Sequence, residues 1–230
     1  MAAKEDLHLF EAAVRNSREA AAAVNIFRQR VNTVLCKGSS HEIQIYTRLH
    51  ALMFCVWAEA EHLRLVYTPY GFSSTEIREV LRQRSVEDRW KKILEIGLSR
   101  TQLDPNGSMR RQFSPRLQRL IEEFIVGPAQ LRNKIAHGQW IDAFNGDSSG
   151  LNAETKQRLT VLDVIEVDRW HFVFKRLSLI LEDSIESPQR AFRRDTWTRI
   201  AEVEEGLQRM RTWTVESKVE KLKSKRRIEN

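Results

Sequence analysis

The chain has 230 residues, of which 41% are hydrophobic and 30% charged, so it carries enough apolar material for a folded core and is not of the disordered class. Its formal net charge is +7, and its 27 arginines outnumber its 11 lysines. A guanidinium group binds phosphate through two hydrogen bonds at once and stacks on bases, which favours nucleic acid as a partner. Surface ion pairs with the 31 acidic residues would explain the composition equally well.

Cysteine usage and apolar runs bear on metals, membranes and location. Cys36 and Cys55 are isolated thiols without metal-ribbon spacing, so we expect neither a metal site nor a disulfide framework, and no cofactor. The longest apolar run, Ala51–Ala58, falls far short of the about 18 residues that cross a bilayer. We therefore expect a cytoplasmic protein without a membrane segment.

The first third of the chain has the apolar spacing of helices. Apolar residues recur at three- and four-residue steps over Lys4–Cys36, and Gly38-Ser39 then has the residues of a helix end and a new N-cap. A helix over about His41–Tyr67 is apolar nearly all round at its centre, which predicts a place in the middle of a bundle. Shorter helices are predicted after Ser73 or Ser74 and over Ser85–Leu98.

Three polar residues, Glu59, Glu61 and His62, follow the apolar centre of the second predicted helix. A carboxylate on a buried helix needs an arginine partner, so one of the two glutamates is a candidate to face a functional arginine elsewhere in the chain. An ordinary solvated helix turn is the alternative interpretation of the same three residues.

The segment Thr101–Phe113 is rich in turn residues and is predicted to be a loop. Within it Arg110 and Arg111 stand beside Phe113, two cations next to an aromatic ring, which is a candidate RNA-binding patch. Ser114-Pro115 is expected to open the next helix, and Gly127-Pro128 is expected to break it and start another.

The helix expected after Gly127-Pro128 carries the sequence Leu131-Arg-Asn-Lys-Ile-Ala-His-Gly138. At 100° per residue, Arg132, Asn133, Ala136 and His137 share one arc of about 140°, and Leu131 and Ile135 lie on the other side. We therefore expect the two apolar residues to dock on the core and the polar arc, with its small Ala136, to remain accessible to another surface.

After this helix, Gln139–Asn145 and Leu151–Leu162 flank a turn and predict a small β-hairpin, followed by a core helix over about Val167–Glu186. Residues 188–230 predict one long C-terminal helix. The basic residues at its end form either a solvated terminus or an RNA contact; they are Lys218, Lys221, Lys223, Lys225, Arg226 and Arg227. The predicted organisation is an all-α domain over 1–187 and a helical extension over 188–230.

The Arg132-Asn133 pair followed by Ala136-His137-Gly138 resembles the R-x(4–6)-H motif of HEPN domains, over about ten residues and otherwise through helix order alone. This resemblance implies an all-α HEPN-like bundle, and for many members a metal-independent endoribonuclease whose two motifs meet at a homodimer interface. In some members an acidic residue also orients the catalytic arginine or histidine, a role that Glu59 or Glu61 could take.

By the same resemblance, Arg132 would bind the scissile phosphate, His137 would be the general acid or base, and Asn133 would orient one of them. Lys134 is a further candidate RNA contact. Expected partners are RNA, a second copy of the chain and an antitoxin or sensor protein, in toxin–antitoxin or anti-phage defence. The nucleotidylated form of the family has Tyr two residues after the histidine, where Gln139 stands here. The alternative is a non-catalytic HEPN-like module that binds RNA, a nucleotide or a partner protein.

Overall fold

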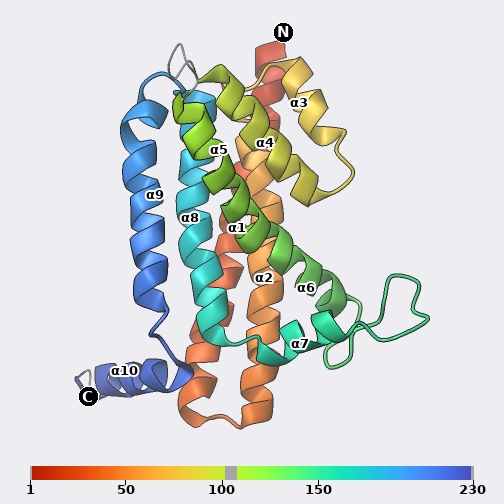
Figure 1. The fold of residues 1–230 in the computed structure, drawn as a ribbon, viewed down its shortest axis with the longest axis vertical. Coiled ribbons are helices and arrows are strands. Elements are labelled where there is room, and N and C mark those ends of the chain that lie inside the picture. Colours follow the sequence, from red (N-terminus) through yellow and green to blue (C-terminus); the bar gives the residue numbers. More distant parts are fainter. Residues whose placement is uncertain (1, 102–107, 229–230) are drawn as a thin grey trace.

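The computed structural model describes residues 2–101 and 108–228, and their regular secondary structure is helical apart from one isolated β-bridge (Figure 1). The all-α prediction is confirmed. The helices are α1 Ala2–Lys37, α2 Ser40–Val66, α3 Ser74–Leu81, α4 Val86–Arg100, α5 Ser108–Ile121, the π-helix η1 Glu122–Val126, α6 Gly127–Ala136, α7 Ala153–Val161, α8 Val164–Glu186, α9 Ala191–Met210 and α10 Val215–Ile228. None of the helices described is long and apolar enough to cross a membrane.

Helix α2 occupies the centre of the bundle, as its apolar middle predicts, and packs against α1, α4, α6 and α8. Its Phe54 and Trp57 meet Phe174 of α8 edge to face, at ring-centroid distances of 5.5 and 4.7 Å. Trp90 of α4 contacts the same Phe174 ring at 5.6 Å. Aromatic pairs of this geometry contribute more free energy than their buried area alone, so this cluster fixes α2 as the element against which the other helices pack.

Serine side chains start three of the early helices, as predicted. Ser39 and Ser73 form reciprocal capping boxes with Glu42 and Glu76, and Ser85 accepts a hydrogen bond from the backbone N–H of Asp88. Each cap satisfies backbone donors that would otherwise have no partner. The boundaries of α2, α3 and α4 therefore follow from local chemistry.

The break predicted at Gly127-Pro128 is wrong, because α5, η1 and α6 run on as one helical column (Figure 1). Over Glu122–Val126 the backbone widens into a π-helix, and the Gly127 N–H donates to the Glu122 carbonyl. A wider turn accommodates the Pro128 ring, whose missing N–H costs least near the start of a helix. Helix α5 also begins at Ser108 and passes through Pro115, so residues 108–113 are helical instead of forming a loop; residues 102–107 lie outside the described chain.

The predicted β-hairpin after the motif does not form, because neither of its two segments is a strand. Only one antiparallel bridge forms, between Phe144 and Leu151. Residues 153–161 are helical because the Asn152 side chain caps α7, accepting from the Thr155 N–H at 2.8 Å. Residues 139–145, whose polar and apolar side chains alternate, form bends and a loop instead of a strand.

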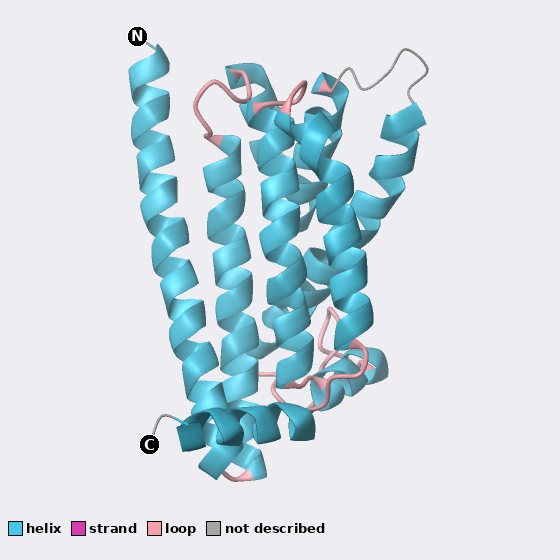
Figure 2. Cartoon of the chain, turned by 90° about the vertical axis from the view of Figure 1, so that its left-hand side faces the viewer, coloured by secondary structure: helices cyan, strands magenta, loops and turns pink. Residues whose placement is uncertain are grey.

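The single long C-terminal helix is replaced by two helices at a sharp angle, and α10 lies across one end of the bundle (Figures 1 and 2). Thr214 and Ser217 exchange side-chain-to-backbone hydrogen bonds of 3.0 and 3.2 Å, which starts α10 as a new helix. Helix α9 shares the main core through Phe192, Ile200 and Val203. The segment predicted as an extension thus contributes one helix to the central core.

Candidate functional site

The motif helix α6 presents the two faces that the sequence predicts. Leu131 and Ile135 are 3% and 2% exposed and belong to the main core, while Asn133, Ala136 and His137 are exposed. Arg132 is half-buried between the two faces. Because the apolar side anchors α6 on the bundle, the polar arc is held on a rigid support and remains open to a ligand or to another chain.

Arg132 forms an ion pair with Glu59, and this contact joins α6 to α2. Arg132 Nη2 contacts Glu59 Oε1; the two side chains are 25% and 36% exposed. The Nε atom of Arg132 is buried and has no hydrogen-bond partner among the described residues. The ion pair uses the guanidinium nitrogen that faces α2, so Glu59 fixes the direction in which the guanidinium of Arg132 points.

Glu61, the other glutamate considered for this role, lies in a separate buried network. Arg64 donates to its Oε1 from Nε and Nη2 at 3.0 and 2.9 Å, Ser178 donates at 2.7 Å, and Ser17 also donates to this carboxylate. Burial alone would raise the pKa of the Glu61 carboxyl, but these hydrogen bonds hold the pKa below its ordinary value. Glu61 therefore ties α1, α2 and α8 together and does not reach the motif arginine.

His137 ends α6. Its backbone N–H donates to the Asn133 carbonyl at 3.2 Å, and Gly138 follows with φ of +76°, a left-handed conformation that favours glycine. The imidazole is exposed, with no hydrogen-bond or ion-pair partner in the described part of the chain. A histidine presented in this way is accessible to a bound ligand or to another chain.

The remaining histidines lie elsewhere. Three of them, His50, His62 and His171, are buried, and burial lowers their pKa values to about 3, 4 and 4. We call these the three buried histidines; they stay neutral at pH 7. The exposed His8 and His41 stand on α1 and in the first turn of α2. Of the six histidines, all in the described part of the chain, His137 is therefore the one that lies at the motif.

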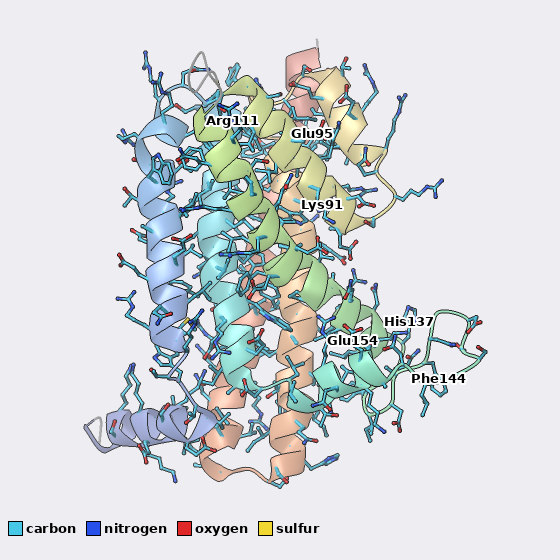
Figure 3. All side chains as sticks on the ribbon, viewed as in Figure 1. Lys91, Glu95, Arg111, His137, Phe144 and Glu154 are labelled. Atoms are coloured by element: carbon cyan, nitrogen blue, oxygen red, sulfur yellow. The ribbon has the colours of Figure 1, made fainter. Side chains whose placement is uncertain are left out.

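Three side-chain hydrogen bonds order the loop that follows the motif, and two of them join it to α6. Lys134 Nζ donates to the Phe144 carbonyl at 2.5 Å, Gln139 Oε1 accepts from the Phe144 N–H at 2.8 Å, and Trp140 Nε1 donates to the Ile135 carbonyl at 2.9 Å. Lys134, a candidate RNA contact in the sequence, thus has a structural partner. Figure 3 shows His137 and Phe144 together at this corner of the molecule.

The aromatic member of the predicted RNA-binding patch, Phe113, is not available to a ligand. Phe113 is fully buried and packs against Phe192 and Trp197 of α9, so its ring cannot stack on a base. The Arg110 side chain lies outside the described residues, and Arg111 is exposed at the opposite end of the molecule from His137 (Figure 3). Phe113 lies on the side of α5 that packs against α9, whereas the sequence predicted an exposed loop at this position.

No group of three or more His, Cys, Asp or Glu side chains within the described residues could hold a metal ion. The chain matches no protein-family model, no curated protein and no solved structure. The features of the molecule that bear on function are therefore the residues of α6, Glu59, and the all-helical frame that supports them.

Proposed function

We propose that the chain is a metal-independent endoribonuclease of HEPN type that acts as a homodimer in the cytoplasm, in toxin–antitoxin or anti-phage defence. The observation that carries this proposal is the arrangement on α6: an arginine held by Glu59 and an exposed histidine one helical turn and a half later, on the face opposite a buried Leu131 and Ile135. The motif's resemblance to HEPN domains supplies the substrate class.

The reaction consistent with these groups is transesterification within RNA. The 2′-oxygen attacks the adjacent phosphorus, a 2′-O–P bond forms, and the bond from phosphorus to the 5′-oxygen breaks, giving a 2′,3′-cyclic phosphate. One proton leaves the 2′-hydroxyl and one joins the departing 5′-oxygen. Arg132 would neutralise the charge that grows on the phosphate oxygens, and Asn133 would orient the phosphate or His137.

A second copy of the chain would complete the site. The reaction needs both a general base and a general acid, and each chain contributes one histidine at the motif. The exposed apolar side chains Ile141, Phe144 and Leu151 lie in the loop beside His137, at 69%, 40% and 62% exposure. A two-fold axis near the exposed Ala136 would cover such residues and bring two copies of Arg132 and His137 together.

The test is cleavage of a single-stranded oligoribonucleotide by the purified protein in EDTA, with the 3′ ends of the products identified. We expect cyclic phosphate ends, and loss of cleavage in His137→Ala. The matched control is His41→Ala, which removes an exposed histidine far along α2 from the motif and should remain active. Tight RNA binding without any cleavage would instead indicate a non-catalytic module.

A further inference from the structure

A large basic cavity lies at the α10 end of the bundle, about 840 Å³ in volume, between α1, α8 and α10. Its cationic lining consists of Arg28, Lys175, Arg176, Lys218, Lys221 and Lys225. One carboxylate, Asp168, lines it as well. Figure 1 shows α10 on the other side of the bundle from α6 and the loop that follows it. The cavity is therefore a separate place in the fold from the motif arc.

Ion pairs within the cavity wall compensate only part of this charge. Lys218 pairs with Asp168, and Arg176 Nε donates to Glu202 at 3.3 Å while its guanidinium lies 3.9 Å above the Phe172 ring. Within the described residues, Arg28, Lys175, Lys221 and Lys225 have no carboxylate within 4.0 Å. Cations gathered in a concave wall raise the local positive potential and attract a multivalent anion.

Two buried groups respond to the same cations. The pKa of His171, which lines the cavity, falls to about 4, through burial and then through Lys175 and Arg28. The pKa of His50 falls to about 3, through burial first, then through His171, and after it through Lys218 and Arg28. The positive field thus extends into the protein beneath the cavity floor.

Other lining groups distinguish a nucleotide from a bare polyphosphate. Trp213 is 44% exposed at the turn before α10, and the Lys221 ammonium lies 5.9 Å from its ring centroid. An exposed indole beside a cation can stack on a base. The Oδ1 atom of Asn32, another lining residue, is buried and has no hydrogen-bond donor in the described part of the chain. It could accept from a sugar hydroxyl or a base amino group, and polyphosphate has neither.

The size of the cavity favours a small ligand. Its volume of about 840 Å³ falls within the range of about 300–1,000 Å³ found for small-molecule sites. A nucleoside di- or triphosphate carries about three or four negative charges, comparable to the four cations that lack a carboxylate. Helix α10 forms one wall and is docked on α1 by Val215, Val219 and Leu222.

We propose that this cavity between α1, α8 and α10 binds a nucleoside polyphosphate, with the phosphates at Arg28, Lys175 and Lys221, the base on Trp213, and a sugar hydroxyl or base amino group at Asn32. The site goes beyond the proposed ribonuclease function and does not depend on it. Because α10 closes one side of the cavity, ligand binding should also hold α10 on the bundle.

Isothermal titration calorimetry of the full chain tests the assignment, with the four ribonucleoside triphosphates, tripolyphosphate and a short single-stranded RNA as separate probes. At least one nucleotide should bind with a micromolar dissociation constant, at least tenfold more tightly than tripolyphosphate. Lys175→Ala/Lys221→Ala should weaken nucleotide binding at least tenfold, and Trp213→Leu should weaken nucleotide but not tripolyphosphate. Lys223→Ala is the matched control, because Lys223 is exposed on the same helix and does not line the cavity.

Thermal melts monitored by circular dichroism establish that each variant is folded before titration. Arg132→Ala should bind nucleotide like the original chain, which separates this site from the proposed cleavage site. Failure of every nucleotide to bind, equal losses in Lys223→Ala and in the double variant, or binding of RNA alone through these lysines would each overturn the assignment.

Discussion

Two glutamates on α2, separated by one residue, should respond to substitution in opposite ways. Glu59→Ala removes the partner of Arg132, whose side chain is only partly buried, and the pair itself is partly solvent-screened. For such a pair we expect a loss of about 1 kcal/mol of stability, the upper end of the range for exposed pairs. In a chain of this size that lowers the melting temperature by about 2–4 °C.

The effect of Glu59→Ala on cleavage should be larger than its effect on folding. Without Glu59 the guanidinium loses its fixed direction, and small misplacements of a catalytic group cost up to about a hundredfold in rate. We expect cleavage ten- to a hundredfold slower, mainly in kcat. In the Arg132→Ala background, Glu59→Ala should cause no further loss, because both substitutions remove one contact.

Glu61→Ala provides the contrast. It leaves Arg64 without one carboxylate in a buried network, and breaking a buried pair costs about 3–5 kcal/mol. Below its lowered melting temperature, the folded protein should cleave RNA at the original rate. The assays are thermal melts and initial rates on the same oligoribonucleotide. A fully active Glu59→Ala protein, or a Glu61→Ala protein that is folded and inactive, would refute the positioning role of Glu59.

Three further outcomes follow from the structure. Ala136→Trp should wedge the proposed interface, so light scattering should report a monomer and cleavage should fall with it; an active monomer would exclude the dimeric site. The three buried histidines have pKa values below the unfolded value of about 6.5, so below that pH the unfolded chain binds more protons than the folded chain. Denaturant titrations should therefore show the free energy of unfolding falling from pH 6.5 toward pH 4, by up to about 1.4 kcal/mol per pH unit for each histidine. Gly206→Ala should lower the melting temperature, because the added Cβ would lie 2.0 Å from the Phe172 ring, and an unchanged melt would show that the ring can move.

Local signals in the sequence were sufficient for much of the helical frame. Serine caps and apolar spacing predicted the boundaries of α2, α3 and α4, and the helical period predicted that Leu131 and Ile135 face the core. These features depend on residues within one or two turns of each other. The polar arc of α6 could be predicted for the same reason.

Features set by distant residues could not be predicted from local patterns. From the sequence, Glu59 and Glu61 are equally good candidates to pair with a functional arginine. Only the packing of α2 on α6 pairs Glu59 with Arg132. Phe113 is buried because α9 lies over it. The basic cavity could not be predicted because its walls come from α1, α8 and α10, which are distant in the sequence, and only the lysines of the last helix form a visible cluster there.

In the proposed function, Arg132 and His137 cleave RNA without a metal ion. The most direct measurement is the initial rate of cleavage of a single-stranded oligoribonucleotide in EDTA, for the original chain, Arg132→Ala, His137→Ala and the His41→Ala control. We expect cleavage by the original chain and by the control, and rates at least a hundredfold lower for the two motif variants, with all four proteins folded. Cleavage that requires added Mg²⁺, or that persists in folded His137→Ala, would contradict the claim.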